Sequence, residues 1–109
     1  MLKYKAKQYF KLFSDKNING LSSMFSKTIT LRDWKIKSKG LKSVLKENIK
    51  IFKNCKSIHV KPLKIFQEKK TIIAELRICI NKSKNLLVID VIEFDKQKKI
   101  KSIRAYLGN

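Results

Sequence analysis

The sequence predicts an α+β fold in which three N-terminal helices pack in a curved antiparallel β-sheet. Two observations carry this prediction. Apolar residues recur at helical spacing up to Asn54, and from there to the end they alternate with polar residues. The alternating segments are joined by the short polar runs EKK, KSKN and KQKK. Because short connections favour antiparallel neighbours, we expect a meander with the helices on one of its faces.

Helical spacing predicts three helices. We expect the first over residues 2–14, with a stripe of lysines on its solvent face, and the third over residues 41–53. A short second helix follows the capping residues of segment 14–17. The residues expected to face the core are Leu2, Ala6, Tyr9, Phe10, Phe13, Ile18, Leu21, Met24, Phe25, Leu41, Val44, Leu45, Ile49 and Phe52.

Alternation predicts the strands. A short extended piece over residues 29–32 ends at Asp33 and Trp34, and residues 35–40 are expected to form a loop. Pro62 cannot donate to a sheet ladder, which indicates an edge strand or a bulge. The four long strands are expected at residues 58–67, 71–81, 86–95 and 99–107.

The chain is strongly basic, with 27 Lys and Arg against eight Asp and Glu, a net charge of +19. Such a charge favours nucleic acid or an anionic membrane as a partner. Only three of the basic residues are arginine, which is best suited to phosphate and base contacts, and the hairpin lysines lie at both ends of the meander. Nucleic acid is therefore a secondary alternative. No apolar run approaches the roughly 20 residues that cross a bilayer, so no membrane partner is expected.

The length of 109 residues predicts a single domain over residues 1–109. Cys55 and Cys79 have neither a CxxC spacing nor a neighbouring His–Cys cluster, which indicates buried thiols and no metal site. Free thiols are typical of a reducing compartment. The first ten residues intersperse lysines among apolar residues, unlike a signal peptide. We therefore expect a cytoplasmic protein.

Three segments resemble a known superfamily: QYFKLFS, MFSKTITLRDW and LLVIDVIEFDKQKKIKSIRAY. They are similar to the nuclear transport factor 2-like (NTF2-like) superfamily, in its SnoaL-like and ketosteroid isomerase-like branch. The resemblance implies a cone-shaped α+β barrel that encloses a deep apolar pocket for a small apolar or carbonyl-containing ligand. It also implies a homodimer formed through the outer sheet face, and chemistry that needs no cofactor.

The resemblance implies three catalytic positions. Asp33 matches the general base, while Tyr9 and a protonated Asp90 match the two donors to the developing enolate oxygen. A carboxylic acid donates only when apolar surroundings keep it neutral, for which ketosteroid isomerase is the worked example. Trp34 stands where the isomerases commonly have proline, which is a departure from their pattern. The positions implied to bind the ligand are Trp34, Val88, Ile103, Ala105 and Leu107.

The residues leave structural alternatives open at each position. A carboxyl in the apolar strand around Asp90 must be neutral or paired. One hairpin register places Arg77 opposite Asp90, and a shifted register places Leu76 or Ile78 there. Tyr9 is also typical of a core tyrosine, and Asp33 of a residue that caps a turn.

Three functional hypotheses follow. The first is a cofactor-independent proton-transfer isomerase, or a related lyase, acting on a small carbonyl compound. The second is a non-catalytic module of the same fold that binds a ligand or another protein. The third is a nucleic-acid-binding protein whose affinity falls steeply with salt.

Overall fold

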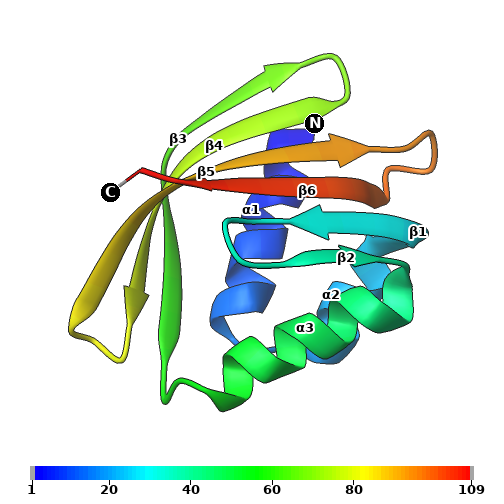
Figure 1. The fold of residues 1–109 in the computed structure, drawn as a ribbon. Helices are drawn as coiled ribbons and strands as arrows, with labels where there is room; N and C mark the ends of the chain where they lie inside the picture. The colour runs from blue at the N-terminus through cyan, green and yellow to red at the C-terminus, as the bar shows by residue number, and fades with distance from the viewer. Residues whose placement is uncertain (1, 109) are drawn as a thin grey trace.

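The structure, a computed structural model, describes residues 2–108. Within these residues the chain forms three helices and six strands, arranged as in Figure 1. The helices predicted at 2–14 and 41–53 are confirmed with the same ends, and the four long strands with ends within two residues. In chain order the elements are α1 (Leu2–Ser14), α2 (Ile18–Met24), β1 (Phe25–Arg32), β2 (Lys37–Lys39), α3 (Leu41–Lys53), β3 (Ile58–Glu68), β4 (Thr71–Ile80), β5 (Lys84–Phe94) and β6 (Ile100–Leu107).

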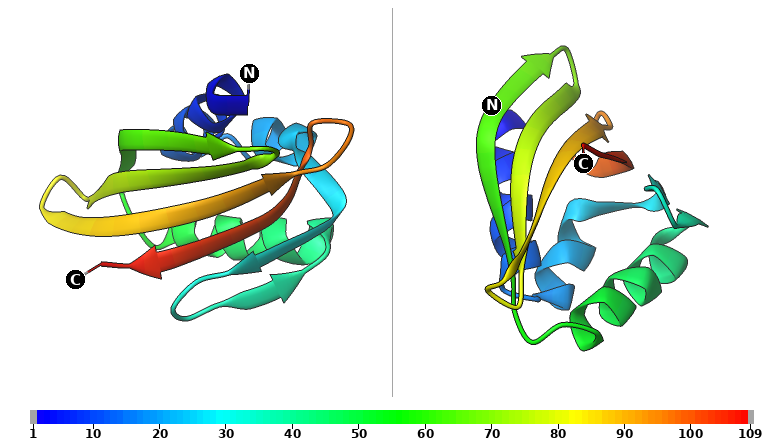
Figure 2. Two further views of the ribbon diagram at one scale, coloured as in Figure 1. Left: turned by 90° about the horizontal axis from the view of Figure 1, so that it is seen from above. Right: turned by 60° about the vertical axis from the view of Figure 1, so that its left-hand side comes forward.

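The strands form one mixed sheet in the order β2-β1-β6-β5-β4-β3. The sheet curves around the helices, as the right-hand view of Figure 2 shows. β3 to β6 form the predicted antiparallel meander. β1 instead runs parallel to β6, so the prediction of a wholly antiparallel sheet is wrong there. β1 enters the sheet from α2, so no short hairpin sets its direction relative to β6.

β2 occupies part of the segment 35–40 that was predicted as a loop, and the prediction is wrong for its three residues. Their sequence, KSK, has no apolar side chain, so alternation gave no signal for a strand. β2 pairs antiparallel with β1 and forms one edge of the sheet, while β3 forms the other. The sheet is therefore open: the expected cone-shaped α+β layout is present, and its strands do not close into a barrel.

The core lies between the sheet and the helices that cover one of its faces. α1 contacts β3 and β4, and α3 contacts β1 and β2. The largest fully buried side chains come from all three helices and from β1, β4, β5 and β6: Phe10, Phe94, Leu21, Ile29, Ile72, Leu76, Ile92, Ile100, Val44 and Val88.

The buried face of α3 differs in part from its prediction. Val44 and Phe52 are buried as expected, but the other three predicted core positions are half-buried. Asn48 is buried instead, and its Nδ2 donates to the Val44 carbonyl at 2.9 Å. The helix itself satisfies this amide, which allows a polar residue on the buried face.

Two local features set the strand registers. Pro62 lies in the edge strand β3 beside a register shift against β4, which confirms the predicted bulge. The β4–β5 loop covers residues 81–83, and its first residue, Asn81, has a φ of 54°. The Asn81 side-chain oxygen accepts the Lys56 N–H at 2.7 Å and the Ser57 N–H at 3.3 Å. These bonds tie the end of β4 to the α3–β3 connection.

Membrane-spanning helices are not a feature of the described chain. Between residues 2 and 108, no helix is long and apolar enough to cross a membrane.

Candidate functional site

Asp90 lies in the middle of β5 on the face that the helices cover. Only 7% of the residue is exposed. Two positions away along the strand on either side, Val88 and Ile92 are buried apolar side chains. An ionised carboxylate without a partner is costly in such surroundings, so the site favours the neutral acid.

Asp90 has an alanine beside it on each neighbouring strand. It lies opposite Ala74 of β4 and opposite Ala105 of β6. Directly opposite residues on one sheet face have their Cβ atoms about 4.5–5.5 Å apart. The carboxyl is therefore flanked by methyl groups. They cannot neutralise a negative charge on Asp90, and they occupy less space than longer side chains would.

The predicted pair between Asp90 and Arg77 is not formed. Arg77 lies opposite Leu87 and is exposed on the sheet face that the helices leave uncovered. The alternative register, with Leu76 or Ile78 opposite Asp90, is wrong as well. Both registers assumed a later turn, whereas the bonds of the β4–β5 loop to the α3–β3 connection end β4 earlier.

Burial raises the pKa of Asp90 to about 7, and the negative charge of Asp33 adds to this effect. A carboxyl with this pKa is largely protonated below neutral pH. In that state it can donate a hydrogen bond, which a carboxylate cannot. The structure thus brings Asp33 and Asp90 close enough for their charges to interact.

Tyr9 lies on the buried face of α1, where 6% of it is exposed. Its ring contacts the rings of Phe10, Phe13 and Phe25 at centroid distances of 5.5, 6.0 and 6.0 Å. Burial raises the pKa of the Tyr9 hydroxyl well above its ordinary value, and the charge of Asp90 raises it further. The phenol therefore keeps its proton and remains a donor at physiological pH.

The polar ends of Tyr9 and Asp90 are free for an added partner. The hydrogen bonds formed among residues 2–108 include neither the Tyr9 hydroxyl nor the Asp90 carboxyl. Every fully covered polar side-chain atom of that segment does have a partner. The hydroxyl and the carboxyl therefore keep accessible area despite the burial of their residues.

Asp33 follows β1 and begins the turn to β2. Its Oδ1 accepts the N–H groups of Lys35 and Ile36, both at 2.7 Å, and its own N–H donates to the Ile36 carbonyl at 2.9 Å. Asp33 thus has the turn-forming role that the sequence left open. The two bonds to Oδ1 fix the orientation of the carboxylate, while none of the described hydrogen bonds uses Oδ2.

The five predicted ligand-binding residues divide between core and surface. Val88 and Ile103 are buried and Ala105 is half-buried, all on the face that carries Asp90. Trp34 in the β1–β2 turn is 42% exposed, and Leu107 near the end of β6 is 37% exposed. The first three lie on the same sheet face at or near Asp90, whereas Trp34 and Leu107 lie at the molecular surface.

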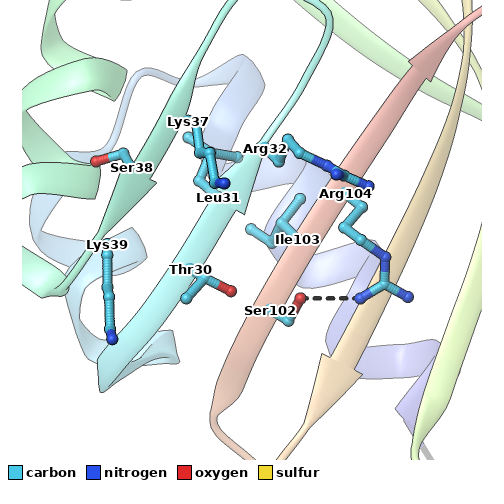
Figure 3. A pocket seen from close by; sticks show the side chains of 9 residues that line it. All are labelled: Thr30, Leu31, Arg32, Lys37, Ser38, Lys39, Ser102, Ile103 and Arg104. Carbon is cyan, nitrogen blue, oxygen red and sulfur yellow. Dashed lines mark hydrogen bonds between the residues drawn. The ribbon is translucent and has the colours of Figure 1, made fainter.

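Two surface hollows are lined by other residues than Tyr9, Asp33 and Asp90, although Ile103 borders the first of them. One, of about 390 Å³, opens over β2, β1 and β6 (Figure 3) and is lined by Thr30, Leu31, Arg32, Lys37, Ser38, Lys39, Ser102, Ile103 and Arg104. A second, of about 600 Å³, lies at the start of α3 and is lined by Lys27, Lys39, Gly40, Leu41, Lys42, Ser43 and Lys46. Neither of these two groups of basic side chains was predicted from the sequence. The sequence shows that arginine is scarce, but it gives no sign that β1 pairs with β6, the pairing that brings Arg32 and Arg104 together.

Both cysteines carry free thiols. Cys55 and Cys79 are half-buried rather than fully buried. Within residues 2–108, no group of three or more His, Cys, Asp or Glu side chains is arranged to hold a metal ion.

Neither the protein-family models nor the curated proteins contain a match to this sequence. Solved structures do match it. A SnoaL-like protein of unknown function from Burkholderia thailandensis has a TM-score of 0.86 at 8% identity, with 99% of this chain and 94% of that chain covered. A protein from Shewanella denitrificans described as a candidate SnoaL-like polyketide cyclase has a TM-score of 0.86 at 11% identity, covering 97% and 89%. This chain has the NTF2-like fold.

A third match to the NTF2-like fold carries a ligand. It is a protein with a ketosteroid isomerase-like fold from Catenulispora acidiphila, in complex with trimethylamine, with a TM-score of 0.84 and 13% identity. The match covers 93% of this chain and 82% of that chain. Identities this low establish the NTF2-like fold and leave the activity to be argued from the residues of this chain.

Proposed function

We propose that this protein binds a small apolar carbonyl compound between its sheet and its helices and isomerises it by proton transfer. The burial of Asp90, which favours its protonated form, within electrostatic reach of the buried Tyr9 hydroxyl carries this proposal. Two neutral donors with accessible polar ends, set among apolar side chains, suit an oxygen on which negative charge develops. Ala74 and Ala105 keep the space beside the carboxyl free of larger side chains.

In this mechanism Asp33 acts as the general base. Its Oδ1 is held by two backbone N–H groups, and Oδ2 takes a proton from the carbon next to the substrate carbonyl. The electron pair of that C–H bond moves into the carbonyl, and the resulting enolate oxygen accepts hydrogen bonds from Tyr9 and Asp90. Asp33 then returns the proton to another carbon, so no proton is gained or lost and no cofactor is consumed.

Deuterium exchange tests this assignment without knowledge of the natural substrate. The probe is 2-indanone, an apolar ketone with acidic α-hydrogens, followed by proton NMR in D₂O. We expect the wild-type protein to accelerate exchange and Asp33→Asn to abolish the acceleration, because the amide keeps an oxygen for the turn but is no base. Asp95→Asn is the matched control, since the Asp95 carboxylate likewise accepts two backbone N–H groups in a turn.

The rival function is a non-catalytic ligand-binding module of the same fold. The bonds of Asp33 within its own turn favour this rival, because they give the residue a purely structural task. It predicts equal exchange rates in the wild type and in Asp33→Asn, with 2-indanone binding that depends on Tyr9. Equal rates would remove the isomerase assignment.

We also infer a homodimer formed through the sheet face that the helices leave uncovered. Phe66, Ile73 and Leu87 are 57, 39 and 42% exposed there, and Phe66 lies opposite Ile73 across the β3–β4 ladder. A second copy would bury this apolar group. Sedimentation should give a dimer for the wild type and a monomer for Phe66→Asp; a monomeric wild type at 100 µM contradicts the inference.

The cytoplasm is the proposed location, on the basis of the two thiols. Cys55 and Cys79 are both free, as in proteins of reducing compartments. Protein purified without reductant should therefore show two reactive thiols after unfolding, and loss of both to a disulfide would contradict this location.

A further inference from the structure

The hollow over β2, β1 and β6 concentrates the arginines of the chain. Arg32 and Arg104 are two of its three arginines, and they lie directly opposite each other in the parallel β1–β6 ladder. Both side chains line the hollow of about 390 Å³. Figure 3 shows Arg32, from β1, reaching toward β6, which carries Arg104.

The positive charge continues onto β2. Lys37 lies opposite Arg32, so Arg104, Arg32 and Lys37 form a row across three strands. Lys39 also lines the hollow, and none of its lining residues is acidic. Like charges opposite each other in a sheet destabilise it, and an anion placed among them would remove this repulsion.

The protein's own groups compensate only part of this charge. Glu93 forms an ion pair with Arg104. Arg32 instead donates to the Tyr106 hydroxyl at 3.4 Å. This hydroxyl is neutral, so it does not compensate the charge of Arg32. That bond from Arg32, reinforced by Arg104, lowers the pKa of Tyr106 below its ordinary value, as expected where the local potential is positive.

We propose that this hollow binds the phosphate group of an anionic ligand. A guanidinium presents a planar fork of donors that matches phosphate oxygens, and Thr30 and Ser102 add hydroxyl groups from the same lining. Ser102 Oγ accepts from Arg104 Nη1 at 3.1 Å, so its own hydrogen remains for the ligand. The volume is within the range of small-molecule sites, roughly 300–1,000 Å³. This site is separate from the proposed isomerase site and does not depend on it.

The test is a titration with inorganic pyrophosphate at 150 mM salt, followed by the backbone amide signals in NMR. We expect shifts confined to the segments 30–32, 37–39 and 102–104. Arg32→Gln should weaken binding about tenfold or more, because one charge-assisted contact is lost. Lys7→Gln is the control that removes the same unit of charge and should change the Kd less than about twofold, since Lys7 is exposed on α1, away from the hollow and from the proposed dimer face.

A second variant acts in the opposite direction. Glu93→Gln releases Arg104 from its ion pair and should tighten pyrophosphate binding by about two- to fivefold. Equal weakening by Arg32→Gln and Lys7→Gln would overturn the proposal, because binding would then follow net charge alone. Shifts spread over all lysines, or an unchanged affinity in Glu93→Gln, would overturn it as well.

A third titration distinguishes the two sources of a phosphate group. If a single-stranded DNA 12-mer competes with pyrophosphate and extends the shifts beyond the hollow, the phosphate comes from a nucleic-acid backbone. If the 12-mer does not displace pyrophosphate, the ligand is a free phosphorylated small molecule. Either result supports a phosphate site at Arg32 and Arg104.

Discussion

Asp90 lies directly opposite Ala74 across the β4–β5 ladder. This register decides the chemistry available to the carboxyl. Arg77 lies three residues further along β4, and a register that placed it opposite Asp90 would have neutralised the carboxylate. With a methyl group in that place, burial favours the protonated form and brings the pKa of Asp90 to about 7. The isomerase proposal depends on this relationship more than on any other.

Burial of Asp90 makes the stability of the protein depend on pH. The pKa of its carboxyl is about 7 in the folded protein, against 3.8 as the ordinary value. The fold therefore favours the protonated form, and this contribution is complete below about pH 4 and is lost as the pH rises to about 7. Its size is on the order of 4 kcal/mol. Urea unfolding of the wild type between pH 4 and pH 8 should show this fall in the free energy of unfolding.

Asp90→Asn is the comparison for that experiment, because its side chain does not titrate. As the pH rises from 4 to 7, the wild type should lose stability relative to the variant. Parallel pH profiles for the two proteins would mean that Asp90 does not titrate in this range.

Tyr9→Phe separates the hydroxyl from the ring. Phenylalanine keeps the contacts with Phe10, Phe13 and Phe25, so the free energy of unfolding should change by less than about 1 kcal/mol. Loss of the donor should slow 2-indanone exchange by about 100-fold or more. Undiminished exchange in a folded Tyr9→Phe variant would exclude the hydroxyl as an oxyanion donor.

Asn81→Ala should destabilise the fold by about 1–3 kcal/mol. The substitution leaves the Lys56 and Ser57 N–H groups without their acceptor and places alanine at a φ of 54°. Asn85→Ala, an exposed position at the start of β5, is the control and should be nearly neutral. If the two variants unfold at the same urea concentration, the bonds of Asn81 do not secure the end of β4.

Periodicity was sufficient to predict most of the fold. The helices at 2–14 and 41–53 and the four strands of the meander each have an internal signal, in apolar spacing or in a short polar connection. The parallel pairing of β1 with β6 has none, because the two strands are far apart in sequence and no connection constrains them. β2 was missed for a related reason, since its polar residues are extended only because β1 lies beside them.

The candidate site shows the same division. Burial of Asp90 and Tyr9 followed from their apolar neighbours, but the residue opposite Asp90 did not, because the register is set by bonds from Asn81 to a distant connection. The basic hollow was beyond sequence reasoning entirely. Arg32 and Arg104 become neighbours only through the β1–β6 pairing, and single-sequence patterns carry no information on non-local strand partners.

The carboxyl titration of Asp90, followed by carbon NMR and assigned with Asp90→Asn, tests the central claim most directly. The structure predicts a pKa of about 7 for the wild type. It also predicts a lower value in Asp33→Asn, because the negative charge of Asp33 contributes to the shift. A wild-type value at or below the ordinary 3.8 would contradict the account, since Asp90 would then be ionised at neutral pH and unable to donate a hydrogen bond.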